Sequence, residues 1–122
     1  MAQSYRELKV WQKAVAMVTD VYRITRSFPR EEIYGLTSQI RRAAVSIPSN
    51  IAEGKGRTNR DFSRFLMQAR GSLWELETQL QIACNLGYVS SEVLEDVLTQ
   101  TAEVGRMLNG MLKAFQGEQA AD

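Results

Sequence analysis

The chain has 122 residues, of which 44% are hydrophobic and 24% are charged, values typical of one soluble globular domain. Fifteen lysines and arginines nearly balance fourteen aspartates and glutamates, so the net charge of +1 exerts no overall attraction on nucleic acid or membrane. The single cysteine, Cys84, excludes an intramolecular disulfide, and the absence of histidine removes the most common general base and metal ligand. Most familiar enzyme mechanisms are therefore disfavoured, and we expect no catalytic residue, metal or cofactor.

The first residues lack the basic start and the apolar run of a secretory signal. No segment approaches the roughly 20 consecutive apolar residues that a helix needs to cross a bilayer. We therefore expect a cytoplasmic protein with a reduced thiol and no membrane partner.

Helical periodicity begins near residue 8 and ends before Pro29. Two sets of residues recur at spacings of three and four in this segment, which places each set on its own face of a helix. One set is Leu8, Trp11, Val15, Val18, Tyr22 and Thr25, and the other is Val10, Ala14, Met17, Val21, Ile24 and Phe28. The pattern predicts a helix with a broad apolar surface.

A second helix is predicted from about residue 32 to residue 53. Its apolar stripe is Ile33, Leu36, Ile40, Ala44, Ile47 and Ile51. Gly54 and Gly56 follow it as a stop signal. Pro48 removes a backbone hydrogen bond and crowds the carbonyl group of Ala44, at a cost of about 3 kcal/mol. Because the apolar phase continues past the proline, we predict one helix kinked at Pro48 rather than two helices.

Two further helices follow. The third begins at Thr58 or Asn59, ends near Gly87, and carries the stripe Phe62, Phe65, Ala69, Leu73, Leu76, Leu80 and Ala83. The fourth begins after Ser90 or Ser91 and carries the stripe Leu94, Val97, Thr101, Val104, Leu108, Met111 and Phe115.

Amphipathic helices joined by short connections, with no alternating strand pattern, predict an all-α fold. The expected architecture is an antiparallel up-and-down four-helix bundle. It forms one domain over residues 1–116, and the polar segment 117–122 is predicted to be a flexible tail.

The third predicted helix carries a second apolar line opposite its core stripe, formed by Met67, Gly71, Trp74, Thr78 and Ile82. A glycine inside a helix is most easily explained where another backbone or a large ring approaches closely. Together with the broad apolar surface of the first helix, this line predicts a homo-oligomer. The candidate interface comprises Val10, Met17, Val21, Ile24, Met67, Gly71, Trp74 and Ile82. The alternative is that both helices are buried on several sides within one subunit.

Charge is unevenly distributed along the chain. Residues 41–70 carry seven basic and two acidic groups, whereas residues 71–122 carry two basic and eight acidic groups. The basic set is Arg41, Arg42, Lys55, Arg57, Arg60, Arg64 and Arg70, which we expect near one end of the bundle. Guanidinium groups suit the phosphates of RNA or DNA, with RNA favoured. The alternatives are that these residues only increase solubility, or that they pair with the acidic fourth helix of a neighbouring subunit.

Polar side chains recur at fixed places inside the apolar helices. Asn50, Glu53 and Gly54 follow the proline, and Ser72 and Glu75 lie in the middle of the third helix. We predict that they form a structural network that satisfies the carbonyl group freed by Pro48. The alternative is a small pocket in which the two glutamates act as a metal-binding or acid–base pair.

Five segments of the chain form a specific set of motifs. They are IRRAA at residues 40–44, SIPSNIAEG at 46–54, ARGSLWELET at 69–78, LGY at 86–88 and MLNGML at 107–112. This set resembles the proteins encoded in intervening sequences of 23S ribosomal RNA. The resemblance implies a four-helix bundle that assembles as a homo-oligomer, a ring of five, with no established catalytic activity. A related branch resembles the accessory proteins of diversity-generating retroelements, which are pentamers that bind nucleic acid and a reverse transcriptase.

The sequence thus predicts a non-enzymatic, oligomeric bundle that binds nucleic acid through its arginines. The alternative is a structural or protein-binding scaffold, for example one associated with a polymerase, with no direct contact to nucleic acid.

Overall fold

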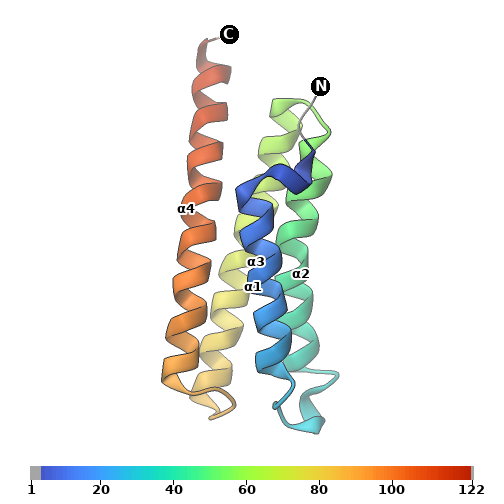
Figure 1. Ribbon diagram of the computed structural model, residues 1–122, viewed down its shortest axis with the longest axis vertical. Coiled ribbons are helices and arrows are strands. Elements are labelled where there is room, and N and C mark those ends of the chain that lie inside the picture. The colour runs from blue at the N-terminus through green and yellow to red at the C-terminus, as the bar shows by residue number, and fades with distance from the viewer. Residues whose placement is uncertain (1–3, 122) are drawn as a thin grey trace.

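The structure is a computed structural model that describes residues 4–121, with side chains described for residues 4–116. Four α-helices and two short 3-10 helices make up the regular structure of the described residues. They are η1 (Tyr5–Glu7), α1 (Lys9–Thr25), η2 (Arg30–Glu32), α2 (Leu36–Lys55), α3 (Asn59–Asn85) and α4 (Ser91–Ala121). Successive α-helices run in opposite directions side by side (Figure 1). This arrangement confirms the predicted all-α four-helix bundle.

The predicted second helix differs from α2 at both ends. Residues 30–32 form the separate turn η2, and the Glu32 carboxylate Oε1 accepts a hydrogen bond from the Leu36 backbone N–H at 3.2 Å. Glu32 therefore satisfies the first turn of α2 from outside the helix instead of belonging to it. The helix passes through Pro48 without interruption, which confirms one helix instead of two. Gly54 lies inside α2, and Gly56 is the residue that caps its C-terminal end.

The predicted starts of the third and fourth helices are confirmed by side-chain caps. The Thr58 hydroxyl accepts a hydrogen bond from the Asp61 N–H at 3.3 Å, and the Ser90 hydroxyl accepts one from the Val93 N–H at 3.2 Å. Gly87 follows α3 with a φ of 81°, a left-handed conformation that favours glycine. At the other end of α4 the helix continues to Ala121, past Phe115, the last residue of its predicted stripe, because most residues beyond Phe115 are good helix formers.

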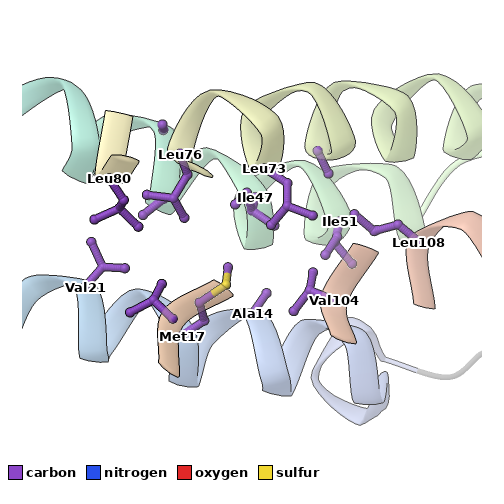
Figure 2. Packing of buried hydrophobic residues seen from close by; sticks show 14 of the residues in the cluster. Ala14, Met17, Val21, Ile47, Ile51, Leu73, Leu76, Leu80, Val104 and Leu108 are labelled. Carbon is purple, nitrogen blue, oxygen red and sulfur yellow. The ribbon is translucent and has the colours of Figure 1, made fainter. Parts of the chain in front are cut away.

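The core lies between all four helices. Figure 2 shows Ala14, Met17 and Val21 of α1 pointing toward side chains of the other three helices. Partners in this cluster include Ile47, Ile51, Leu73, Leu76, Leu80, Val104 and Leu108. On α3, Leu66 is buried and Phe65 is only partly buried, so the predicted stripe is wrong at that one position.

Four of the eight residues predicted to form the oligomer interface lie on α1, and this part of the prediction is wrong. Val10, Met17 and Val21 are 2%, 0% and 0% exposed within a single subunit. Ile24 is partly buried and packs against the same core. The set of α1 residues assigned to an oligomer interface therefore lines the core of the bundle itself, because this face of α1 turns toward α2, α3 and α4.

Helices α2 and α3 form the most extensive pairing in the bundle, and α1 and α4 meet along a seam that closes it. The seam carries an ion pair of 2.8 Å between Lys13 Nζ and Glu103 Oε1, and Lys13 holds the pKa of the Glu103 carboxyl below its ordinary value. It also carries a hydrogen bond of 3.2 Å from Gln100 Nε2 to Asp20 Oδ2. Two cavities, of about 190 and 450 Å³, lie along this seam.

None of the helices in the described part of the chain is long and apolar enough to span a membrane.

Candidate nucleic-acid interface

The seven basic residues predicted to form one cluster are divided between two ends of the bundle. Arg41 and Arg42 lie in the first half of α2, whereas Lys55 ends this helix and the remaining four lie beyond it. Fourteen residues separate Arg41 from Lys55, which corresponds to about 21 Å along a helix that rises 1.5 Å per residue. The prediction that all seven lie near one end is therefore wrong. Closeness in sequence does not mean closeness in space along a helix of this length.

The connection between α2 and α3, with the first turns of α3, carries the larger part of the set. Arg60 is exposed and has no hydrogen bond or ion pair to any described residue. Arg64 makes one ion pair, of 3.8 Å, with Asp61 on the preceding turn. Arg57 donates from Nε to the Glu53 carbonyl oxygen at 3.3 Å. The charge of these guanidinium groups therefore remains available to a ligand.

An aromatic ring supports one of these arginines. The guanidinium carbon of Arg57 lies 4.9 Å from the centre of the Phe65 ring, within the range of a cation–π contact.

Lys55, at the end of α2, is partly buried. We define the α2–α3 basic end as Lys55, Arg57, Arg60 and Arg64. It carries four basic groups against two acidic ones, Glu53 and Asp61.

Arg70 has a different role from the rest of the set. Its NH1 atom donates to Asn109 Oδ1 at 2.9 Å, and its guanidinium carbon lies 5.1 Å from the centre of the Trp74 ring. Arg70 therefore joins α3 to α4 and is committed to contacts within the subunit.

The predicted polar network exists in part, but the backbone carbonyl that it reaches is that of Ser46 and not the Ala44 carbonyl next to Pro48. The hydroxyl oxygens of Ser46 and Ser72 lie 2.8 Å apart and join α2 to α3. Asn50 Nδ2 donates to the Ser46 carbonyl oxygen at 2.8 Å and to its hydroxyl at 3.0 Å. Ser46 connects the other two side chains and was missed by the sequence analysis, although its spacing of four residues from Asn50 was a signal that could have found it.

The two glutamates of the motif do not join this network. The Glu53 carboxylate is exposed and bonds to no described residue, and Glu75 Oε1 accepts only from Gln79 Nε2, at 3.3 Å. Among residues 4–116 no group of three or more His, Cys, Asp or Glu side chains is placed to hold a metal ion. Gly54 has a packing role, because a Cβ atom there would meet two aromatic side chains of α3.

The second apolar line of α3 remains uncovered in the single subunit. Met67, Trp74 and Ile82 are 47%, 56% and 45% exposed. A Cβ atom added at Gly71 would meet nothing within 4 Å. The α3 apolar face, defined as Met67, Gly71, Trp74 and Ile82, is therefore not explained by packing within the subunit.

Comparison with known proteins agrees with this architecture. A solved structure from Bacteroides thetaiotaomicron, described as a protein with unknown function from the S23 ribosomal protein family, has the same fold. It is 22% identical, with a TM-score of 0.76 over 85% of this chain and 98% of that chain. No curated protein matches this chain. Residues 6–110 match the family model described as 23S rRNA-intervening sequence protein, and the chain therefore belongs to this family.

Proposed function

We propose that this protein is a cytoplasmic, non-enzymatic homo-oligomer that binds RNA through the α2–α3 basic end. The observation that carries the proposal is the exposure of Arg57, Arg60 and Arg64 with little ion pairing around them. Guanidinium groups bind phosphate in a bidentate fork, and each contact releases counterions from the nucleic acid. The name of the family, which refers to ribosomal RNA, favours RNA over DNA.

The ligand surface is suited to the phosphate backbone rather than to bases. Phe62 is buried, and Phe65 is partly buried and covered by Arg57. These rings do not form an exposed platform on which bases could stack. We therefore expect RNA binding with little sequence preference and a steep dependence on salt.

The test is equilibrium binding of a structured RNA, followed by fluorescence anisotropy across a salt series. In the variant R57E/R60E, we expect binding to weaken by at least tenfold, since two phosphate contacts are lost and two repulsive charges are added. The slope of log K against log salt should also become shallower, by about 0.7–0.9 for each lost contact.

The matched control is R23E/R106E, which changes the net charge equally on α1 and α4, away from the α2–α3 basic end. It should retain most of the affinity. Equal losses in both double variants, or no binding by the wild type at low salt, would contradict the proposal. A DNA duplex of the same length serves to compare the two nucleic acids.

The second candidate function is a scaffold that binds protein, for example a polymerase, and it is favoured by the α3 apolar face. Exposed apolar patches with a large aromatic residue at the centre, as Trp74 is here, are typical of protein interfaces. We assign this face to self-association. A monomeric mass in light scattering, together with flat anisotropy, would favour the scaffold instead.

A further inference from the structure

Two adjoining cavities lie at the end of the bundle opposite the α2–α3 basic end. Their volumes are about 390 and 350 Å³. They share three lining residues, Ile33, Thr37 and Arg41, and so form one continuous depression, which we call the Thr37 pocket. It lies between the end of α1, the η2 connection and the first turns of α2.

The Thr37 pocket has a strongly positive lining. Four arginines contribute to it, Arg26, Arg30, Arg41 and Arg42, and no acidic side chain does. None of the four has a carboxylate within ion-pair distance among the described residues. The nearby Glu32 is already engaged, since it accepts hydrogen bonds from the Leu36 N–H at 3.2 Å and the Tyr88 hydroxyl at 2.9 Å.

A buried hydroxyl group in the pocket lacks a partner. Thr37 is only 6% exposed, and its Oγ1 atom makes no hydrogen bond to any described residue. Removing a hydroxyl from water without replacing its hydrogen bond is unfavourable. Thr37 lines both cavities, and a ligand in the pocket can supply the missing partner once the hydroxyl, whose oxygen is closed off from solvent, rotates toward it.

Helical spacing brings hydroxyl and guanidinium groups together. Thr37 lies one turn from Arg41, and Ser38 lies one turn from Arg42, so each hydroxyl is a neighbour of an arginine on the surface of α2. Arg41 is held in place because its Nε atom donates to Thr25 Oγ1 at 2.9 Å, its Nη2 atom donates to the Tyr22 carbonyl oxygen at 3.4 Å, and its guanidinium carbon lies 4.6 Å from the centre of the Tyr22 ring. Its Nη1 atom makes no hydrogen bond to a described residue and remains available to a ligand. These residues also lie at the positive end of the α2 dipole.

We propose that the Thr37 pocket binds the phosphate group of a phosphate monoester, with Thr37 and Ser38 as hydroxyl partners and Arg41 and Arg42 as charge partners. A dianion with several oxygens engages two guanidinium groups and two hydroxyls better than a carboxylate does. Tyr22, Ile33 and Val45 form an apolar wall that can contact the organic part of the ligand. The pocket does not depend on the RNA-binding proposal, because the residues of the two sites lie at opposite ends of α2.

The test is calorimetric titration of the full chain with inorganic phosphate in a buffer free of other oxyanions. The variant T37V keeps the shape of the side chain but removes the hydroxyl, and R42Q removes an exposed guanidinium. We expect saturable binding by the wild type that is roughly tenfold weaker in each variant. R106Q, an exposed arginine of α4 outside the pocket, should bind phosphate as the wild type does.

Folding of the variants is checked separately by circular dichroism, and T37V should unfold at a temperature equal to or above that of the wild type, because it removes an unsatisfied polar atom. Absence of saturable phosphate binding by the wild type would overturn the proposal. So would unchanged affinity in both T37V and R42Q, or equally tight binding of citrate.

The phosphate can come from a free small molecule or from the end of a nucleic acid chain. Adenosine monophosphate and a 5′-phosphorylated trinucleotide, each compared with its unphosphorylated form, separate these sources. Tighter binding of the mononucleotide than of inorganic phosphate, with no further gain from the trinucleotide, identifies a free phosphate ester. A further gain in affinity for the 5′-phosphorylated trinucleotide over the mononucleotide, if it persists in R57E/R60E and is lost in T37V, identifies a nucleic acid end.

Discussion

Gly54 controls how closely α2 approaches α3. A Cβ atom at this position would lie 2.7 Å from Phe65 Cβ and 2.8 Å from Phe62 Cδ1. The Phe62 ring is buried and also packs on Phe115 of α4, with ring centres 5.4 Å apart. A side chain at position 54 would therefore displace aromatic rings that connect three helices.

We expect the variant G54A to lower the free energy of unfolding by about 1–3 kcal/mol, the usual range for an overpacked core. This loss outweighs the gain of about 1 kcal/mol that alanine normally gives over glycine within a helix. Urea unfolding, monitored by circular dichroism, measures the net change in the free energy of unfolding. The control is G110A on α4, where an added Cβ meets nothing within 4 Å and the ordinary helix gain should appear. Equal stability changes in the two variants would contradict this account of Gly54.

At the scale of elements, Tyr88 connects two loops at the same end of the bundle. Its hydroxyl donates to Glu32 Oε2 at 2.9 Å, and its ring centre lies 5.5 Å from that of Phe28. The hydrogen bond to Glu32, followed by burial and by the negative charges of Glu32 and Glu31, raises the pKa of Tyr88 above its ordinary value of 10.0. The connection between α3 and α4 is thereby fastened to the η2 turn.

This contact predicts a loss of stability in alkali. A raised pKa in the folded state means that the contribution of Tyr88 is fully present below about pH 10 and is lost as the pH rises through the folded pKa. The variant Y88F should be less stable than the wild type at pH 8, and the difference should shrink above pH 10. Unfolding at several pH values measures this difference. Y34F is the control, since Tyr34 is 95% exposed and should show no such difference. A difference between Y88F and the wild type that stays constant through this range would contradict the role of the hydroxyl.

The helices themselves could be predicted because apolar periodicity is a local property of the sequence. Which residues of a helix are buried, and where the helix begins, depends on the elements that pack against it. Phe65 and Leu66 both continue the spacing from Phe62, and periodicity alone does not show that Leu66 is the buried residue of the two. Ile33 fits the stripe of α2 but belongs to the exposed connection before it.

The candidate sites were harder to predict for the same reason. The sequence grouped Arg41 with Arg57 because they are close along the chain, yet the length of α2 separates them. On the first helix, two apolar faces were recognised, but periodicity alone could not tell which one turns inward. Thr37 gave no signal at all, since the missing hydrogen bond of a hydroxyl can be seen only in three dimensions.

At the scale of the whole molecule, the α3 apolar face is the surface on which we expect subunits to meet. The variant W74E should reduce the mass measured by light scattering without loss of helix content, because it places a charge in an apolar contact. The control is Y34E, which changes an exposed aromatic residue elsewhere on the molecule. An unchanged mass in W74E, or a monomeric wild type, would contradict assembly through this face.

The α1–α4 seam has a consequence for the order in which the chain folds. Each of the other helix pairs is joined by a short connection, so its contacts form after little loop closure entropy is lost. The seam instead joins segments such as those of Lys13 and Glu103, which are 90 positions apart in sequence, and cavities interrupt its packing. We therefore expect these contacts to form last, once the helix pairs joined by short connections have assembled. We also expect the seam to open first when the native protein fluctuates, so that amides along α1 and α4 exchange with solvent before those of the α2–α3 pair.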